Sequence, residues 1–138
     1  MKFFLILKKE EFMILKDYNA DGKPDLWTYH QGENKVQLFK NVGSQEPVFE
    51  FKKNLRAYNF NNPPLDTSDL VHFKGNLPAV VDLDSDGDLD YITNAAFCGS
   101  NITFYRNNTV ELGKSLEDID FEIADYCLGN LGENGVEL

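Results

Sequence analysis

Cysteine, long apolar runs and basic residues are scarce in this sequence, and each shortage excludes a class of protein. Two cysteines are too few for a disulfide framework, and they form no CxxC pair of the kind that binds zinc or performs thiol redox chemistry. The apolar run near the N-terminus, Phe3 to Leu7, is shorter than a secretory signal or a membrane span requires. We therefore interpret residues 1–10 as a strand and expect no membrane span in this chain.

The two cysteines, Cys98 and Cys127, have two interpretations. They are either small buried hydrophobic residues or the two halves of one disulfide, which an oxidising compartment would allow. The sequence leaves both open.

Basic residues are outnumbered: 13 Lys and Arg stand against 23 Asp and Glu, for a formal net charge of -10. A phosphate backbone would be repelled by this charge, so nucleic acid is excluded as an expected partner. The acidic residues are also clustered, since residues 17–25 hold three of them and residues 82–90 hold five. Such clustering indicates a bound cation.

Motifs of catalysis are missing as well. The sequence contains no GxSxG, HExxH or phosphate-binding loop, and its two histidines, His30 and His72, adjoin no nucleophile. We therefore expect a chain that is not an enzyme. The alternative, that the chain is part of an enzyme, stays open.

What the sequence does have is an internal repeat. Residues 17–25 (DYNADGKPD) align with residues 82–90 (DLDSDGDLD) when the chain is shifted by 65 positions. The match continues through 26–29 on 91–94 and, after one inserted residue, through 36–41 on 102–107.

Each unit contains short apolar stretches with a period of two, which predict strands rather than helices. The aromatic share of 13% favours strands too. We predict an all-β fold of two units, each a small sheet of four short antiparallel strands. The expected organisation is a strand that precedes the repeat (1–10), unit 1 (11–53), a loop between the units that is rich in Asn and Pro (54–76), unit 2 (77–127) and a loop-like tail (128–138).

The two acidic windows have the spacing of a calcium-binding loop. Calcium takes six to eight oxygen ligands, and a nine-residue turn presents them at positions 1, 3, 5, 7 and 9, with glycine at position 6 allowing the sharp bend. Magnesium demands tighter geometry, and a soft metal would need Cys or His. We predict two calcium sites, with position 7 contributing its backbone carbonyl: Asp17, Asn19, Asp21, Lys23 and Asp25 in the first loop, and Asp82, Asp84, Asp86, Asp88 and Asp90 in the second.

Two other interpretations compete with these sites. Asp-Gly is a common tight-turn dipeptide, but two matching nine-residue windows in the same strand context argue against simple turns. An EF-hand needs a glutamate at position 12, where this chain has Thr28 and Thr93.

These residues resemble the calcium-loop repeats of the FG-GAP and VCBS type, found in the β-propellers of integrin α-subunits and in many secreted bacterial proteins. The resemblance covers about residues 11–127, and its closest part is residues 82–92 preceded by Pro78-Ala79-Val80-Val81. Residues 121–127 resemble versions carried by surface proteins of Bacteroidetes. The resemblance implies that the two units are four-stranded antiparallel blades of the β-propeller type, that is, a partial propeller, with residues 1–10 as a strand of a preceding blade. A closed propeller needs four to eight blades, so we expect the chain to be a fragment that packs on neighbouring blades. Since some propellers carry active sites, the alternative function is part of a propeller enzyme, a hydrolase or lyase acting on polysaccharide.

The resemblance implies a secreted or cell-surface module, used in adhesion or ligand binding, in which calcium is structural. The expected partner is a protein or carbohydrate ligand that the sequence does not identify. Aromatic residues either form its binding surface or, more simply, pack between the blades: Trp27, Tyr29, Phe39, Tyr58 and Tyr105.

Overall fold

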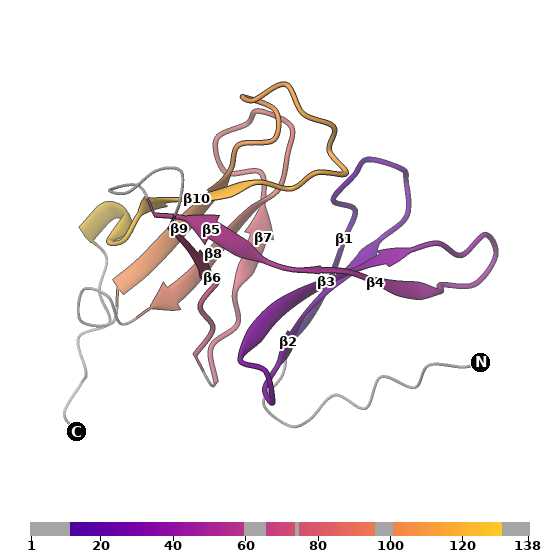
Figure 1. Cartoon of the computed structure of the whole chain (residues 1–138), viewed down its shortest axis with the longest axis horizontal. Coiled ribbons are helices and arrows are strands. Elements are labelled where there is room, and N and C mark those ends of the chain that lie inside the picture. The colour runs from indigo at the N-terminus through magenta and orange to yellow at the C-terminus, as the bar shows by residue number, and fades with distance from the viewer. Residues whose placement is uncertain (1–11, 60–65, 74, 96–100, 131–138) are drawn as a thin grey trace.

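The computed structural model describes residues 12–59, 66–73, 75–95 and 101–130. Within these ranges the chain is all-β apart from one short 3₁₀ turn, and its strands form two sheets (Figure 1). The predicted fold class is therefore confirmed. The predicted strand at 1–10 and the tail after residue 130 lie outside the described residues. The elements are β1 (Met13–Lys16), β2 (Asp25–His30), β3 (Lys35–Asn41), β4 (Phe49–Asn54), β5 (Arg56–Tyr58), β6 (Thr67–Asp69), β7 (Ala79–Val81), β8 (Asp90–Ala95), β9 (Asn101–Asn107), β10 (Phe121–Asp125) and η2 (Leu128–Asn130).

The first sheet is a four-stranded antiparallel meander in the order β1-β2-β3-β4. Its central strand β2 is buried along nearly its whole length, with Trp27 opposite Ile14 on one side and Leu38 on the other. Trp27 and Tyr29 of β2, and Val36 and Leu38 of β3, are each two residues apart and belong to the core, as the period of two predicts.

The second sheet repeats this meander as β7-β8-β9-β10 and then extends it. Strand β5 pairs in parallel with β10, and β6 pairs antiparallel with β5, which gives six strands in the order β6-β5-β10-β9-β8-β7. Both short strands lie in the segment 54–76, for which the sequence predicts a loop, so the loop prediction is wrong there. They form because the open edge of β10 offers unpaired backbone groups, and because the buried residues Leu55 and Leu70 anchor the segment against the core.

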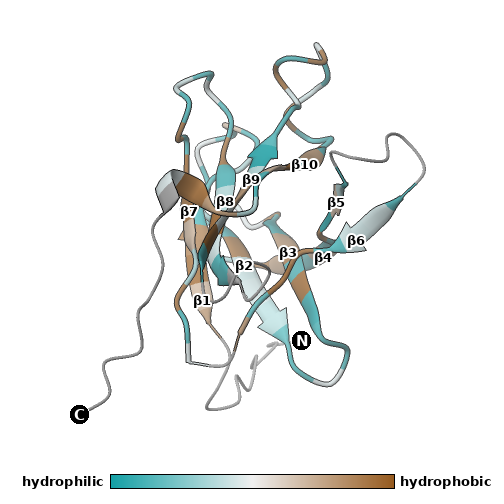
Figure 2. Ribbon diagram, turned by 90° about the vertical axis from the view of Figure 1, so that its left-hand side faces the viewer, coloured by the Kyte–Doolittle hydropathy of each residue, from teal (hydrophilic) through white to brown (hydrophobic). Residues whose placement is uncertain are grey.

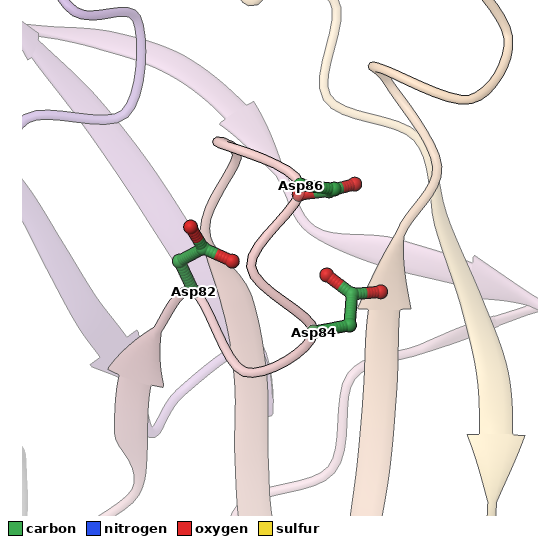
Figure 3. A group of neighbouring side chains, drawn as sticks. All are labelled: Asp82, Asp84 and Asp86. Carbon is green, nitrogen blue, oxygen red and sulfur yellow. The ribbon is translucent and has the colours of Figure 1, made fainter.

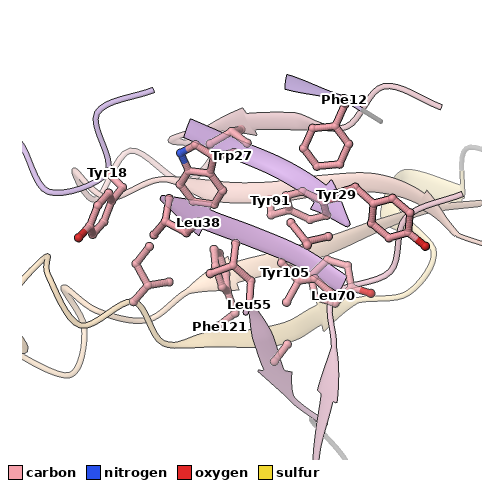
Figure 4. Close-up of a cluster of buried hydrophobic side chains, with 14 of the residues drawn as sticks. Phe12, Tyr18, Trp27, Tyr29, Leu38, Leu55, Leu70, Tyr91, Tyr105 and Phe121 are labelled. Carbon is pink, nitrogen blue, oxygen red and sulfur yellow. The ribbon is translucent and has the colours of Figure 1, made fainter. Parts of the chain in front are cut away.

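The hydrophobic core lies between the two sheets (Figure 4). Trp27 of β2 and Phe121 of β10 meet edge to face with ring centroids 6.4 Å apart, and Tyr91 and Tyr105 meet similarly at 5.8 Å. Of the aromatic residues considered for a binding surface, Trp27, Tyr29 and Tyr105 are buried in this core, whereas Phe39 and Tyr58 are half-buried. The simpler interpretation holds for the three buried rings.

Hydrophobic residues lie mainly along the strands, whereas the projecting loops are mostly hydrophilic (Figure 2). Three connections, β1 to β2, β7 to β8 and β9 to β10, extend from the same end of the molecule (Figure 1). In the described ranges, no helix has the length and apolar character needed to cross a bilayer. Cys127 is disulfide-bonded, and Cys98 lies outside the described residues.

Candidate metal centre

The two acidic loops join the first and second strands of each meander and share one backbone conformation. Ala20 and Gly22 have φ values of 58° and 83°, and Ser85 and Gly87 have 66° and 102°. A Cβ at Gly22 or Gly87 would meet nothing within 4 Å, so steric crowding does not explain the glycines. The positive φ at position 6 explains them, because glycine adopts it without strain. At position 4, alanine and serine adopt the same region at some cost in strain.

Position 9 of each loop is a fully buried aspartate that binds backbone amides. Asp25 accepts from Asn41 N at 2.7 Å and from Tyr18 N at 3.1 Å. Asp90 accepts from Asn107 N at 2.9 Å and from Leu83 N at 2.8 Å. Burial raises the pKa of both carboxyl groups. Each therefore closes its loop and ties it to the third strand of the meander.

An asparagine at the end of the third strand completes this closure. The side-chain amide of Asn41 donates to Pro24 O at 3.2 Å, and that of Asn107 donates to Leu89 O at 3.3 Å. Neither asparagine is among the site residues predicted from the sequence. Their alignment in the repeat was the signal that could have identified them.

In the second loop, carboxylates come together. Asp82, Asp84 and Asp86 project from successive bends of one loop, and one oxygen of each lies within 4.8 Å of the others (Figure 3). Two of these side chains carry a buried oxygen with no hydrogen-bond partner, Asp82 Oδ1 and Asp86 Oδ2. Buried oxygens of this kind are unfavourable unless a donor or a cation reaches them.

The remaining oxygens of this group have partners that hold the loop in shape. Gly87 N donates to Asp82 Oδ2 at 3.2 Å, and Asp88 N donates to Asp86 Oδ1 at 3.0 Å. Asp84 forms an ion pair with Arg106 of β9, with Nε and Oδ2 3.0 Å apart. The carboxylates are thus preorganised, with Asp84 partly neutralised.

The side chain of Asp88 lies in the site as well. The sequence predicts a role only for the backbone carbonyl of this residue. Its side chain is 1% exposed and joins a second group with Asp86 and Glu111, again with oxygens within 4.8 Å of one another. Burial, together with the charges of Asp86, Asp90 and Glu111, raises the pKa of Asp88 to about 7. Glu111 was not identified from the sequence because it lies outside the repeated motif.

In the first loop, hydrogen bonds take the place of crowded charge. Asp17 accepts from Asp21 N at 3.2 Å and from Gly22 N at 2.7 Å, and Asp21 accepts from Lys23 N at 3.0 Å. The amide of Asn19 donates to Asp21 at 3.1 Å. Among the residues that the structure describes, three or more acidic groups converge at the second loop and not here.

Glu117, from the segment between β9 and β10, links the first loop to the second sheet. It accepts from Tyr18 Oη at 2.8 Å and from Asn19 Nδ2 at 2.7 Å. It also pairs with Lys40 and, at 3.1 Å, with Lys52. These contacts hold the pKa of Glu117 well below its ordinary value.

The donor sets fit a hard divalent cation. The predicted side-chain ligands are oxygens only, and the second loop contains unpartnered oxygens where such an ion would bind. Two carboxylate oxygens 4.8 Å apart repel by roughly 3 kcal/mol at an effective dielectric of about 20, and a cation would remove that repulsion. The ten predicted ligands remain predictions for both loops.

Comparison with known protein families matches the FG-GAP-like repeat over residues 17–93, more than half of the chain. Neither the curated proteins nor the solved structures contain a match. The matched segment begins at the first residue of the first acidic loop, includes the whole second loop and ends within β8. The chain belongs to the FG-GAP-like repeat family.

Proposed function

We propose that this chain is a calcium-binding, non-catalytic repeat module of a secreted or cell-surface protein, acting in adhesion or ligand binding. Calcium is structural in this function, with one ion in the loop 17–25 and one in the loop 82–90. Membership of the FG-GAP-like repeat family supports the repeat module, and the acidic groups of the second loop support the cation.

One observation carries the calcium proposal: the buried, unpartnered oxygens of Asp82 and Asp86 lie in one group with Asp84. Carboxylates held together by their own backbone are costly without a cation, and within the described ranges no hydrogen-bond donor reaches the two unpartnered oxygens. When bound, calcium would supply positive charge at this point, and Asp82, Asp84 and Asp86 would hold it.

The position of the loops supports a structural role for the ion. Each connects two strands of a meander, and its ninth residue is bonded to the third strand through Asn41 or Asn107. An ion bound in the loop would therefore stabilise the end of the whole sheet. Extracellular calcium sites have dissociation constants of about 10⁻⁴ to 10⁻³ M, which suits millimolar calcium outside the cell.

Calorimetric titration and thermal unfolding test the proposal together. Calcium binding is expected to give a measurable heat in the titration and to raise the melting temperature. Magnesium at equal concentration should raise the melting temperature less, because its coordination geometry is stricter. The variant Asp82→Asn should lose the ion of the second loop, with Glu50→Gln on exposed β4 as a matched control for loss of one charge. An unchanged melting temperature in calcium and in chelator would overturn the calcium proposal.

A further inference from the structure

A second group of acidic side chains lies beside the loop 82–90 and draws on a distant part of the chain. Asp86 and Asp88 belong to the loop, whereas Glu111 follows β9. One oxygen from each of the three lies within 4.8 Å of the other two. The group therefore joins the second loop to the connection between β9 and β10.

One oxygen of this group points to a ligand other than the ion of the loop. Asp88 is 1% exposed; its Oδ2 accepts from Val110 N at 3.1 Å, while its Oδ1 is buried and has no hydrogen-bond partner. A carboxylate at this depth is stable when a donor or a cation reaches each oxygen.

Glu111 is held in place by the backbone around it. Leu112 N donates to Asn108 O at 3.0 Å, Gly113 N to Val110 O at 2.9 Å and Lys114 N to Thr109 O at 2.9 Å. The bond from Val110 N to Asp88 fixes this turn against the acidic loop. Glu111 thus lies on an ordered turn that is bonded to the acidic loop.

In the part of the chain that the structure describes, no ion pair with lysine or arginine neutralises this group. Among the ion pairs formed by residues within the described ranges, Arg106 binds Asp84 and Glu122, Lys114 binds Asp120, and none includes Asp86, Asp88 or Glu111. Among the described residues, the three carboxylates thus lie close together without an ion pair to a positive side chain.

We propose that Asp86, Asp88 and Glu111 bind a further divalent cation, calcium by the chemistry of its ligands, next to the ion of the second loop. Asp86 contributes to both ions, so the second unit holds a pair of cations. The inference extends the proposed function and rests on it for the ion of the loop itself.

The first unit provides an internal contrast. Position 7 of its loop is Lys23, which carries a positive charge in place of the carboxylate of Asp88. The turn that follows β3 includes Glu46, and within the described residues Glu46 belongs to no acidic group of three. The extra cation is therefore specific to the second unit.

Native mass spectrometry and calorimetric titration of the full chain with calcium test this inference. Glu111→Gln should bind one calcium fewer than the unchanged chain, and Asp88→Asn should do the same. Glu46→Gln, the matched control on the corresponding turn of the first unit, should bind the full number. Glu111 is exposed, so its replacement leaves the fold intact.

The outcomes separate the two proposals. If Glu111→Gln binds as many ions as the unchanged chain, the further cation is overturned, whereas calcium in the loops still stands. If the unchanged chain binds no calcium, both proposals fail. If Asp82→Asn and Glu111→Gln each lose one ion and the double variant loses two, the paired arrangement is established.

Discussion

The two acidic loops have the same backbone and different side chains, and the difference separates what folds the loop from what binds a cation. Both have positive φ at positions 4 and 6, and both end in a buried aspartate that accepts two backbone amides. The first loop then fills its interior with hydrogen bonds. The second leaves oxygens of Asp82 and Asp86 unpartnered.

The aspartate at position 9 therefore stabilises the fold of both loops, whereas positions 3 and 7 set the net charge of each loop. Asn19 and Lys23 in the first loop stand where the second has Asp84 and Asp88. Ligand charge tunes calcium affinity in such loops. We therefore expect the second loop to bind calcium more tightly than the first.

The largest expected effect tests the shared scaffold. Replacing Asp90 or Asp25 by alanine leaves two backbone N–H groups without an acceptor. Each unsatisfied buried donor costs about 1–3 kcal/mol of stability. Either variant should lose roughly 2–5 kcal/mol of unfolding free energy in chelator, measured by urea denaturation. Asp84→Ala, at an exposed position of the same loop, is the control and should change stability little without calcium. Full stability of Asp90→Ala in chelator would contradict the scaffold role.

The next effect tests the difference in calcium binding. At a calcium concentration ten times the dissociation constant, each site should add about 1.4 kcal/mol of stability. Asp82→Asn should remove this gain at a calcium level that fills only the tighter site, while Asp17→Asn should leave it. Thermal unfolding across a calcium series measures both. The reverse order of sensitivity would show that the first loop is the tighter one.

A third effect concerns pH. Burial raises the pKa of Asp88 to about 7, above its pKa in an unfolded chain. At a pH between these two pKa values, folding is therefore accompanied by the uptake of a proton. The calcium-free protein should therefore lose stability as pH rises from about 4 towards 7. Calcium near Asp88 competes with that proton, so its affinity there should fall roughly fivefold from pH 7 to pH 6.

Asp88→Asn is the matched variant for this prediction. It should flatten the dependence of calcium-free stability on pH in this range, which denaturation at several pH values measures. A slope that persists in Asp88→Asn would assign the titration to a different group.

The smallest effect is expected from a variant that makes the first loop more like the second. Asn19→Asp gives the first loop a third-position carboxylate and should strengthen its calcium binding a few-fold. The same change removes the side-chain amide of Asn19, which donates to Glu117 at 2.7 Å. It puts a carboxylate there, which repels the carboxylate of Glu117. In chelator the variant should thus be slightly less stable, by under about 1 kcal/mol. Calorimetry and unfolding without calcium report the two halves separately.

Much of the fold could be predicted because the repeat encodes it locally. Alternating apolar residues such as Val36 and Leu38 located the strands, and two copies of each pattern supported each other. The short strands β5 and β6 were missed because their pairing depends on the open edge of β10, which is distant in sequence.

The candidate site was predictable to the same degree. Spacing alone identified Asp82, Asp84 and Asp86, which the structure brings together. Spacing could not identify Glu111, which reaches the site from another connection, nor show that Asp88 turns its carboxylate inward. Both depend on how the segment after β9 packs against the loop.

The aspartate at position 9 also affects the kinetics of cation exchange. Because Asp25 and Asp90 close their loops through amides of the third strand, the entropy of loop closure is lost when the sheet folds rather than when an ion arrives. Association at such a preformed loop needs no slow rearrangement of the chain, so ions can enter and leave rapidly while the blade stays intact.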